Sequence, residues 1–150
     1  MAVLDAKLEM SDAQSIASLG ASSAVTSTDI LDFGTHKNAW GTAITPDIGE
    51  GGDIEFNVSV DTVLVGASAN VTCNLVTGTA VASGAITSST TVVSLNIPAV
   101  SAAGTRASVK VPSGTVSRYV ATEYIVGTAS ASITSGALNS YLSLDHEKVD

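Results

Sequence analysis

The sequence has few of the residues on which most active sites depend. Its 150 residues include two histidines, one cysteine, one tryptophan, three tyrosines and two phenylalanines, and only 13% are charged. A typical domain has about 25% charged residues. Catalytic pockets, metal sites and nucleic-acid grooves draw on such titratable or aromatic side chains. The composition therefore argues against an enzyme and favours a rigid structural or binding module.

Three further absences narrow the class of protein. A single cysteine cannot form an internal disulfide. No apolar run reaches the length of about 18 residues that a transmembrane helix needs. Asp5 and Glu9 interrupt what would be the apolar part of a signal peptide. We therefore expect a protein that folds in a cytoplasm and binds no membrane.

Small and β-branched residues are abundant in the sequence. The chain has 21 Ala, 18 Val, 21 Ser and 17 Thr, which together make up half of it. Its length is that of one ordinary domain, and a chain of this length can bury a sizeable core without disulfides or metals.

The charge is acidic and unevenly distributed. The net charge is −8, residues 1–61 carry ten acids and two bases, and residues 62–122 carry three bases and no acid. An acidic protein repels phosphate backbones and anionic lipids, which argues against a nucleic-acid partner. The asymmetry has two interpretations: ordinary solvated faces, or an acidic N-terminal region that meets a basic patch across subunits or on a charged partner.

Alternation of apolar and polar residues dominates the chain. In residues 53–61, Ile54, Phe56, Val58 and Val60 point one way and polar residues point the other, which predicts a half-buried strand. The same pattern predicts strands around residues 71–75, 93–97, 106–111 and 138–144. Turn signals recur between such segments, among them Ser83-Gly84, Pro112-Ser113-Gly114 and Ser135-Gly136. Short, evenly spaced strands are typical of a sandwich or a barrel.

Two segments are less regular. Residues 1–20 are expected to form an N-terminal arm or first strand ahead of a sandwich domain at 21–150. Within them Ser11-x-x-Gln14 also fits a capping box, which could begin a short helix at 14–19. Residues 34–50 show neither period and contain Trp40. We expect a long loop there, of the kind that often carries contacts.

The sequence contains no motif typical of a catalytic, cofactor or metal site, so we predict none of these. Cys73 falls on the apolar face of its strand and is expected to be a buried small hydrophobe. A cluster of carboxylates could either be a solvated hairpin loop or bind Ca²⁺ through oxygen ligands: Asp47, Glu50, Asp53 and Glu55.

Several short motifs occur in a characteristic order. They are Leu4-Asp5-Ala6, Ser11–Gln14, Ser27–Gly34, Ala102-Ala103-Gly104-Thr105-Arg106, Val111-Pro112, Arg118-Tyr119, Tyr124–Gly127, Gly136-Ala137 and Leu142–Asp145. In this order they resemble the Bordetella-phage-type capsid cement (decoration) proteins of tailed bacteriophages, over about residues 4–34 and 102–145. The sequence departs from that family in two places. The segment 34–52 is longer than the family's usual turn, and residues 120–123 replace a more apolar and basic stretch.

The resemblance implies an all-β, jelly-roll-like antiparallel β-sandwich that assembles as a homodimer or homotrimer. Such a protein, made in the host cytoplasm, would bind the outer capsid surface of the virion, bridge major capsid protein subunits and strengthen the shell. Candidate contact residues are Asp12, Gln14, Arg106, Arg118 and Tyr119, whose alternative role is ordinary hydrogen bonding at turns and strand ends. The alternative function is another virion β-module, in a head fibre or tail, or a carbohydrate-binding sandwich.

Overall fold

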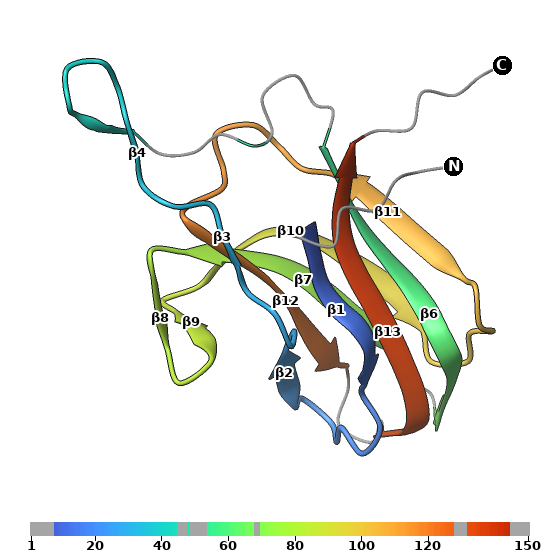
Figure 1. Cartoon of the computed structure of the whole chain (residues 1–150). Helices are drawn as coiled ribbons and strands as arrows, with labels where there is room; N and C mark the ends of the chain where they lie inside the picture. Colours follow the sequence, from blue (N-terminus) through green and yellow to red (C-terminus); the bar gives the residue numbers. More distant parts are fainter. Residues whose placement is uncertain (1–7, 45–47, 49–53, 68–69, 128–131, 145–150) are drawn as a thin grey trace, which may run out of the picture.

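The predicted alternation of apolar and polar residues is realised as antiparallel strands. The computed structural model describes residues 8–44, 48, 54–67, 70–127 and 132–144, and within them it is all-β with no α-helix. Two sheets face each other as a β-sandwich, which confirms the predicted fold class (Figure 1).

The first sheet, sheet A, has four strands. Its order is β1 (Glu9–Ser15), β13 (Ser132–Leu144), β6 (Ile54–Ala67) and β11 (Arg106–Lys110). Sheet B has the order β10 (Thr90–Pro98), β7 (Asn70–Gly78), β12 (Tyr119–Val126) and β2 (Ala24–Thr26), and β3 (Leu31–Asp32) also pairs with β12. Two hairpins complete the described strands: β4 (His36–Lys37) with β5 (Ala43–Ile44), and β8 (Ala80–Ala82) with β9 (Ala85–Thr87).

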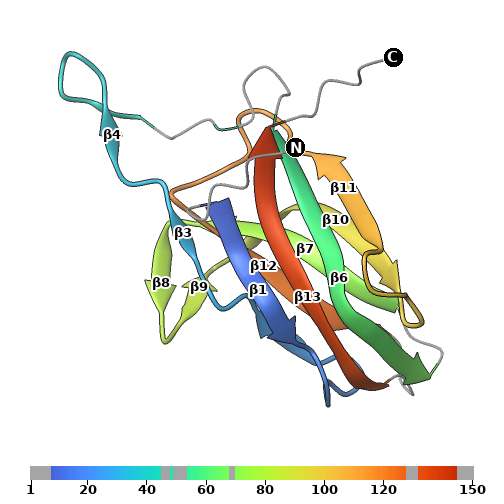
Figure 2. The ribbon, with the colours of Figure 1, turned by 45° about the vertical axis from the view of Figure 1, so that its right-hand side comes forward.

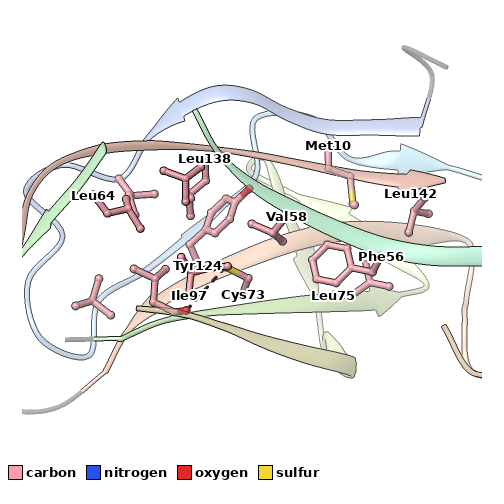
Figure 3. Close-up of a cluster of buried hydrophobic side chains, with 14 of the residues drawn as sticks. Met10, Phe56, Val58, Leu64, Cys73, Leu75, Ile97, Tyr124, Leu138 and Leu142 are labelled. Atoms are coloured by element: carbon pink, nitrogen blue, oxygen red, sulfur yellow. Dashed lines mark hydrogen bonds between the residues drawn. The ribbon is translucent and has the colours of Figure 1, made fainter. Parts of the chain in front are cut away.

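The core lies between the two sheets (Figure 3). Sheet A contributes Phe56, Val58 and Leu138, and sheet B contributes Leu75, Ile97 and other side chains that are almost completely buried. Cys73 is buried among them, as predicted, and burial raises the pKa of its thiol to about 12. A thiol with that pKa stays protonated, so it acts as a small hydrophobe.

Three buried hydroxyl groups also link the sheets. The Tyr124 hydroxyl of sheet B is hydrogen-bonded to Ser11 Oγ of β1, which lies 2.8 Å from Ser140 Oγ of β13. Burial raises the pKa of Tyr124 to about 12. The cluster therefore satisfies three polar groups that would otherwise be costly to bury.

Residues 9–15 are a strand, so the alternative of a helix at 14–19 is wrong. The residues expected to precede this strand, 1–7, lie outside the described residues. In β1 the register shifts between Glu9 and Ser11, because Met10 is an extra residue opposite β13. Met10 and Ser11 are consequently both buried, and the simple alternation of the sequence ends there.

Two other sequence predictions need correction. The segment 34–44 contains the β4–β5 hairpin where a loop was expected, because Asn38 and Gly41 close a tight turn. Ser135-Gly136, expected to be a turn, lies inside β13. Gly136 has a φ of 142° at a register shift in the pairing of β13 with β6, so it allows a bulge within a continuing strand.

Candidate protein-binding surfaces

Asp12 and Arg106, two of the five candidate contact residues, lie at opposite margins of sheet A. Asp12 is exposed on β1, and Arg106 is exposed at the start of β11. Both edge strands are thus marked by a charged candidate residue, but the two residues do not form one site because β13 and β6 separate them.

The other three candidates make contacts within the chain. The Gln14 side chain donates to Thr26 O at 2.9 Å and accepts from Thr28 N at 3.0 Å, so it fastens β1 to the segment after β2. The Arg118 guanidinium donates from Nε and Nη2 to the two oxygens of Asp32, each at 2.8 Å. It also lies 4.7 Å from the centroid of the Tyr119 ring.

The Arg118–Asp32 pair has a clear electrostatic effect. Hydrogen bonds from Arg118 and from the backbone of Gly34 lower the pKa of Asp32 to about 2, and the same pairing raises the pKa of Arg118. Because the ion pair is exposed, its contribution to stability is small. These contacts fit the alternative role of ordinary hydrogen bonding near strand ends, and the role of Gln14, Arg118 and Tyr119 as partner contacts stays a prediction.

The outer face of sheet A forms a broad surface that no other described strand covers (Figure 2). Residues directly opposite one another in a sheet share a face, and one such row crosses all four strands: Glu9, Tyr141, Asn57 and Ser108. Parallel rows run through Asn139, Ser59 and Arg106, and through Ser143, Glu55 and Lys110. These rows are polar, and β6 carries two carboxylates on this face, Glu55 within the rows and Asp61 farther along the strand.

Opposite charges lie at the two margins of the face. Glu9 and Asp12, with Asp29 beside them, form an acidic margin along β1. The pKa of Glu9 is raised by partial burial and by repulsion from Asp12 and Asp29. Arg106 and Lys110 form a basic margin along β11. The asymmetry of charge in the sequence thus has a spatial counterpart on one face.

The β4–β5 hairpin carries the most exposed large apolar side chain of the described residues. Trp40 is 88% exposed at the hairpin's turn, and Ile44 is also exposed. The hairpin stands away from the sandwich (Figure 1). Its turn is fixed by Asn38, whose Oδ1 accepts from Trp40 N at 3.1 Å and from Thr42 N at 2.9 Å, and by Gly41 with a φ of 79°. We refer to Trp40 and Ile44 as the hairpin tip.

A second apolar group lies near the end of β6. Val63 and Val65 are about half exposed, and Val100 is 78% exposed. Leu64 and Ser101 form an antiparallel bridge, which places Val65 laterally beside Val100. We refer to these three valines as the β6 patch. Sequence reasoning missed it, although the outward positions 55, 57, 59 and 61 continue in register to 63 and 65.

The alternative of a Ca²⁺ site in the carboxylate cluster falls mostly outside the described residues. Asp47, Glu50 and Asp53 lie outside them, and Glu55 is on the outer face of β6. Within the described part of the chain, no group of three or more His, Cys, Asp or Glu residues is placed to hold a metal ion. The same part contains no helix long and apolar enough to cross a membrane.

Comparison with protein families gives a match over most of the chain. The family model Bbp16 covers residues 10–142, which is almost the whole sandwich and includes most of β1, all of β2 to β12 and most of β13. The chain belongs to the Bbp16 family. Bbp16 is a family of Bordetella phage proteins, so the membership and the all-β fold fit a bacteriophage structural protein. A search of curated proteins found no match.

Proposed function

We propose that this Bbp16-family protein is a capsid decoration protein. It binds the outer surface of an icosahedral phage head and bridges major capsid protein subunits, and it acts by binding alone. Because it binds the assembled lattice and not the separate subunits, it stabilises the assembled state by mass action. Membership in a phage protein family supports this role.

The observation that carries the proposal is the outer face of sheet A. It is uncovered by other described strands, it is held rigid by long paired strands, and it has carboxylates at one margin and cations at the other. Polar interfaces with charged margins suit association between preformed proteins. A face with two margins of opposite charge can contact two neighbouring subunits at surfaces of opposite charge, as a bridge requires.

Co-sedimentation tests the proposal. Purified protein is mixed with expanded heads that lack it, and bound protein is measured in the pellet. Wild type is expected to pellet with the heads, and Arg106→Glu, which reverses a charge at the basic margin, is expected to bind at least about tenfold more weakly. Lys37→Glu is the matched control, because it makes the same change of charge on the β4–β5 hairpin. At low occupancy, where bound copies have no neighbours, it should bind like wild type.

Failure of the wild type to pellet with expanded heads would contradict the proposal. Binding to phage tails or to glycans in place of heads would instead support the alternative of another virion β-module. Equal binding by wild type and Arg106→Glu would show that the outer face of sheet A is not the contact surface.

A further inference from the structure

The hairpin tip and the β6 patch lie at opposite ends of the molecule. The hairpin is at the upper left and the end of β6 is at the lower right in both views (Figures 1 and 2). Together they contain five of the six large apolar side chains that are exposed among the described residues: Trp40, Ile44, Val63, Val65 and Val100. Exposed apolar groups gathered in this way mark protein contacts more often than single scattered residues do.

The hairpin tip has an exposed indole on a backbone that is held in place by hydrogen bonds. Its backbone is fixed by the hydrogen bonds of Asn38, so little conformational freedom remains to be lost there on binding. Trp40 is flanked by Ala39 and Gly41, and no polar side chain of these neighbours can reach the hydroxyl groups of a sugar stacked on the indole. Tryptophan is enriched among the side chains that dominate protein interfaces. An apolar protein surface is therefore the partner that this tip fits.

The β6 patch has the complementary chemistry. Its three valines give an apolar surface next to Asp61, which shares the outward face of β6 and is exposed. The hairpin carries the opposite charge beside its tip: Lys37 is exposed and is the only acidic or basic residue of β4 and β5 apart from His36. Each surface thus has an exposed apolar group, and the charges beside the two groups, Lys37 and Asp61, are opposite.

We propose that the hairpin tip of one copy docks on the β6 patch of a second copy. Trp40 covers the valines, and Lys37 lies close to Asp61 of the neighbour. Because the two surfaces are different and lie at opposite ends, the contact is head-to-tail and can link more than two copies. A symmetric contact between two hairpin tips is disfavoured, since it brings two Lys37 side chains together.

This contact is small. One tryptophan and a few valines bury much less than the ~1,200 Å² at the lower end of stable interfaces. Association in free solution is therefore weak and depends on concentration, whereas copies held side by side on a surface associate at high effective concentration. The contact goes beyond the proposed decoration function, because it joins copies of the chain and requires no capsid.

The single tryptophan makes the test direct. Trp40 is the only tryptophan of the sequence, so all tryptophan fluorescence reports on the hairpin tip. The emission maximum and acrylamide quenching are measured over a wide range of protein concentration, together with sedimentation velocity. The expected result for the wild type is a blue shift and protection from quenching as the average mass rises. Val65→Asp should abolish both changes, and Val81→Asp, a similarly exposed valine on the β8–β9 hairpin, should leave them intact.

Charge exchange tests the orientation. Lys37→Glu alone and Asp61→Lys alone should each weaken association at least about threefold. An equimolar mixture of the two variants should recover it, because the glutamate introduced on one chain's hairpin then faces the lysine introduced beside the other chain's β6 patch. Three results would overturn the proposal: tryptophan emission that does not change with concentration, association that survives Val65→Asp, or a mixture no stronger than its components. Head binding by a wild type that stays monomeric would overturn this contact and leave the decoration function standing.

Discussion

Tyr124 and Trp40 are both large aromatic residues, but they occupy opposite environments. Tyr124 is fully buried and its hydroxyl is bonded to a serine of the facing sheet, whereas Trp40 is 88% exposed on a hairpin that stands away from the sandwich. The first residue stabilises the fold, and the second contributes almost nothing to it. The comparison separates a side chain that holds the two sheets together from one whose apolar area is open to solvent, which is the side chain that we propose contacts another copy.

Truncation of Tyr124 should have the largest effect on stability. Tyr124→Ala removes a buried ring and leaves Ser11 and Ser140 with a cavity, at a cost of about 3–5 kcal/mol in the free energy of unfolding. Tyr124→Phe keeps the ring and should cost about 1–3 kcal/mol through the lost hydrogen bond. Urea denaturation measures both values. Tyr141→Phe, on the outer face of sheet A, is the control and should change stability by less than about 0.5 kcal/mol. If it lowered the free energy of unfolding as much as Tyr124→Phe does, the buried hydroxyl of Tyr124 would have no special role in stability.

Replacement of Gly136 should have the next largest effect. A Cβ at this position would lie 2.3 Å from Leu64 Cδ2 and 3.2 Å from Leu64 Cα, and the φ of 142° is strained for any L side chain. Gly136→Ala should therefore lower the free energy of unfolding, measured by urea denaturation, by at least about 1 kcal/mol.

Gly41→Ala is the matched variant in the hairpin. Its φ of 79° is also unfavourable for alanine, but no atom lies within 4 Å of the added Cβ. The strain can relax by local fraying of the hairpin, so thermal unfolding of the sandwich should change little. A larger effect at Gly41 than at Gly136 would contradict the separation of hairpin and core.

Trp40→Ala should change stability by less than about 0.5 kcal/mol, because the side chain makes little contact with the rest of the chain. The same variant should lose the rise in mass with concentration that the head-to-tail contact predicts. Thermal unfolding and sedimentation velocity on one sample measure both. A large loss of stability would show that Trp40 packs within its own chain.

The smallest effect concerns the Arg118–Asp32 pair. Since the pKa of Asp32 is lowered to about 2 from an ordinary value of 3.8, its contribution to stability is present above pH 3.8 and is lost as the pH falls toward 2. Titration of the Asp32 carboxyl carbon by NMR should show the low value in the wild type. In Arg118→Gln the pKa should rise toward 3.8, and an unchanged pKa would show that the pairing does not set it.

The sequence predicts the regular strands well, because local alternation determines them. The pattern of Ile54, Phe56, Val58 and Val60 indicates β6 and its buried face, and the position of Cys73 on an apolar face indicates its burial. These predictions need only the period of two.

Features that depend on partners far along the chain could not be predicted. Ser11 is turned inward by a bulge against β13, and Gly136 lies in a continuing strand at a register shift where β6 has the extra residue. The candidate contact residues show the same limit. Arg118 is a candidate contact residue, and its pairing with Asp32, 86 residues away, is not visible in the local sequence. Conversely, the turn Asn38-Ala39-Trp40-Gly41 has the local residues of a hairpin, and this signal was available in the sequence.

A cryo-electron microscopy map of phage heads saturated with the protein tests the central claim most directly. A decoration protein should give density for the sandwich on the outer surface of the shell, with the outer face of sheet A against major capsid protein subunits and Arg106 at that contact. Heads without such density, or a sandwich located in the tail, would contradict it.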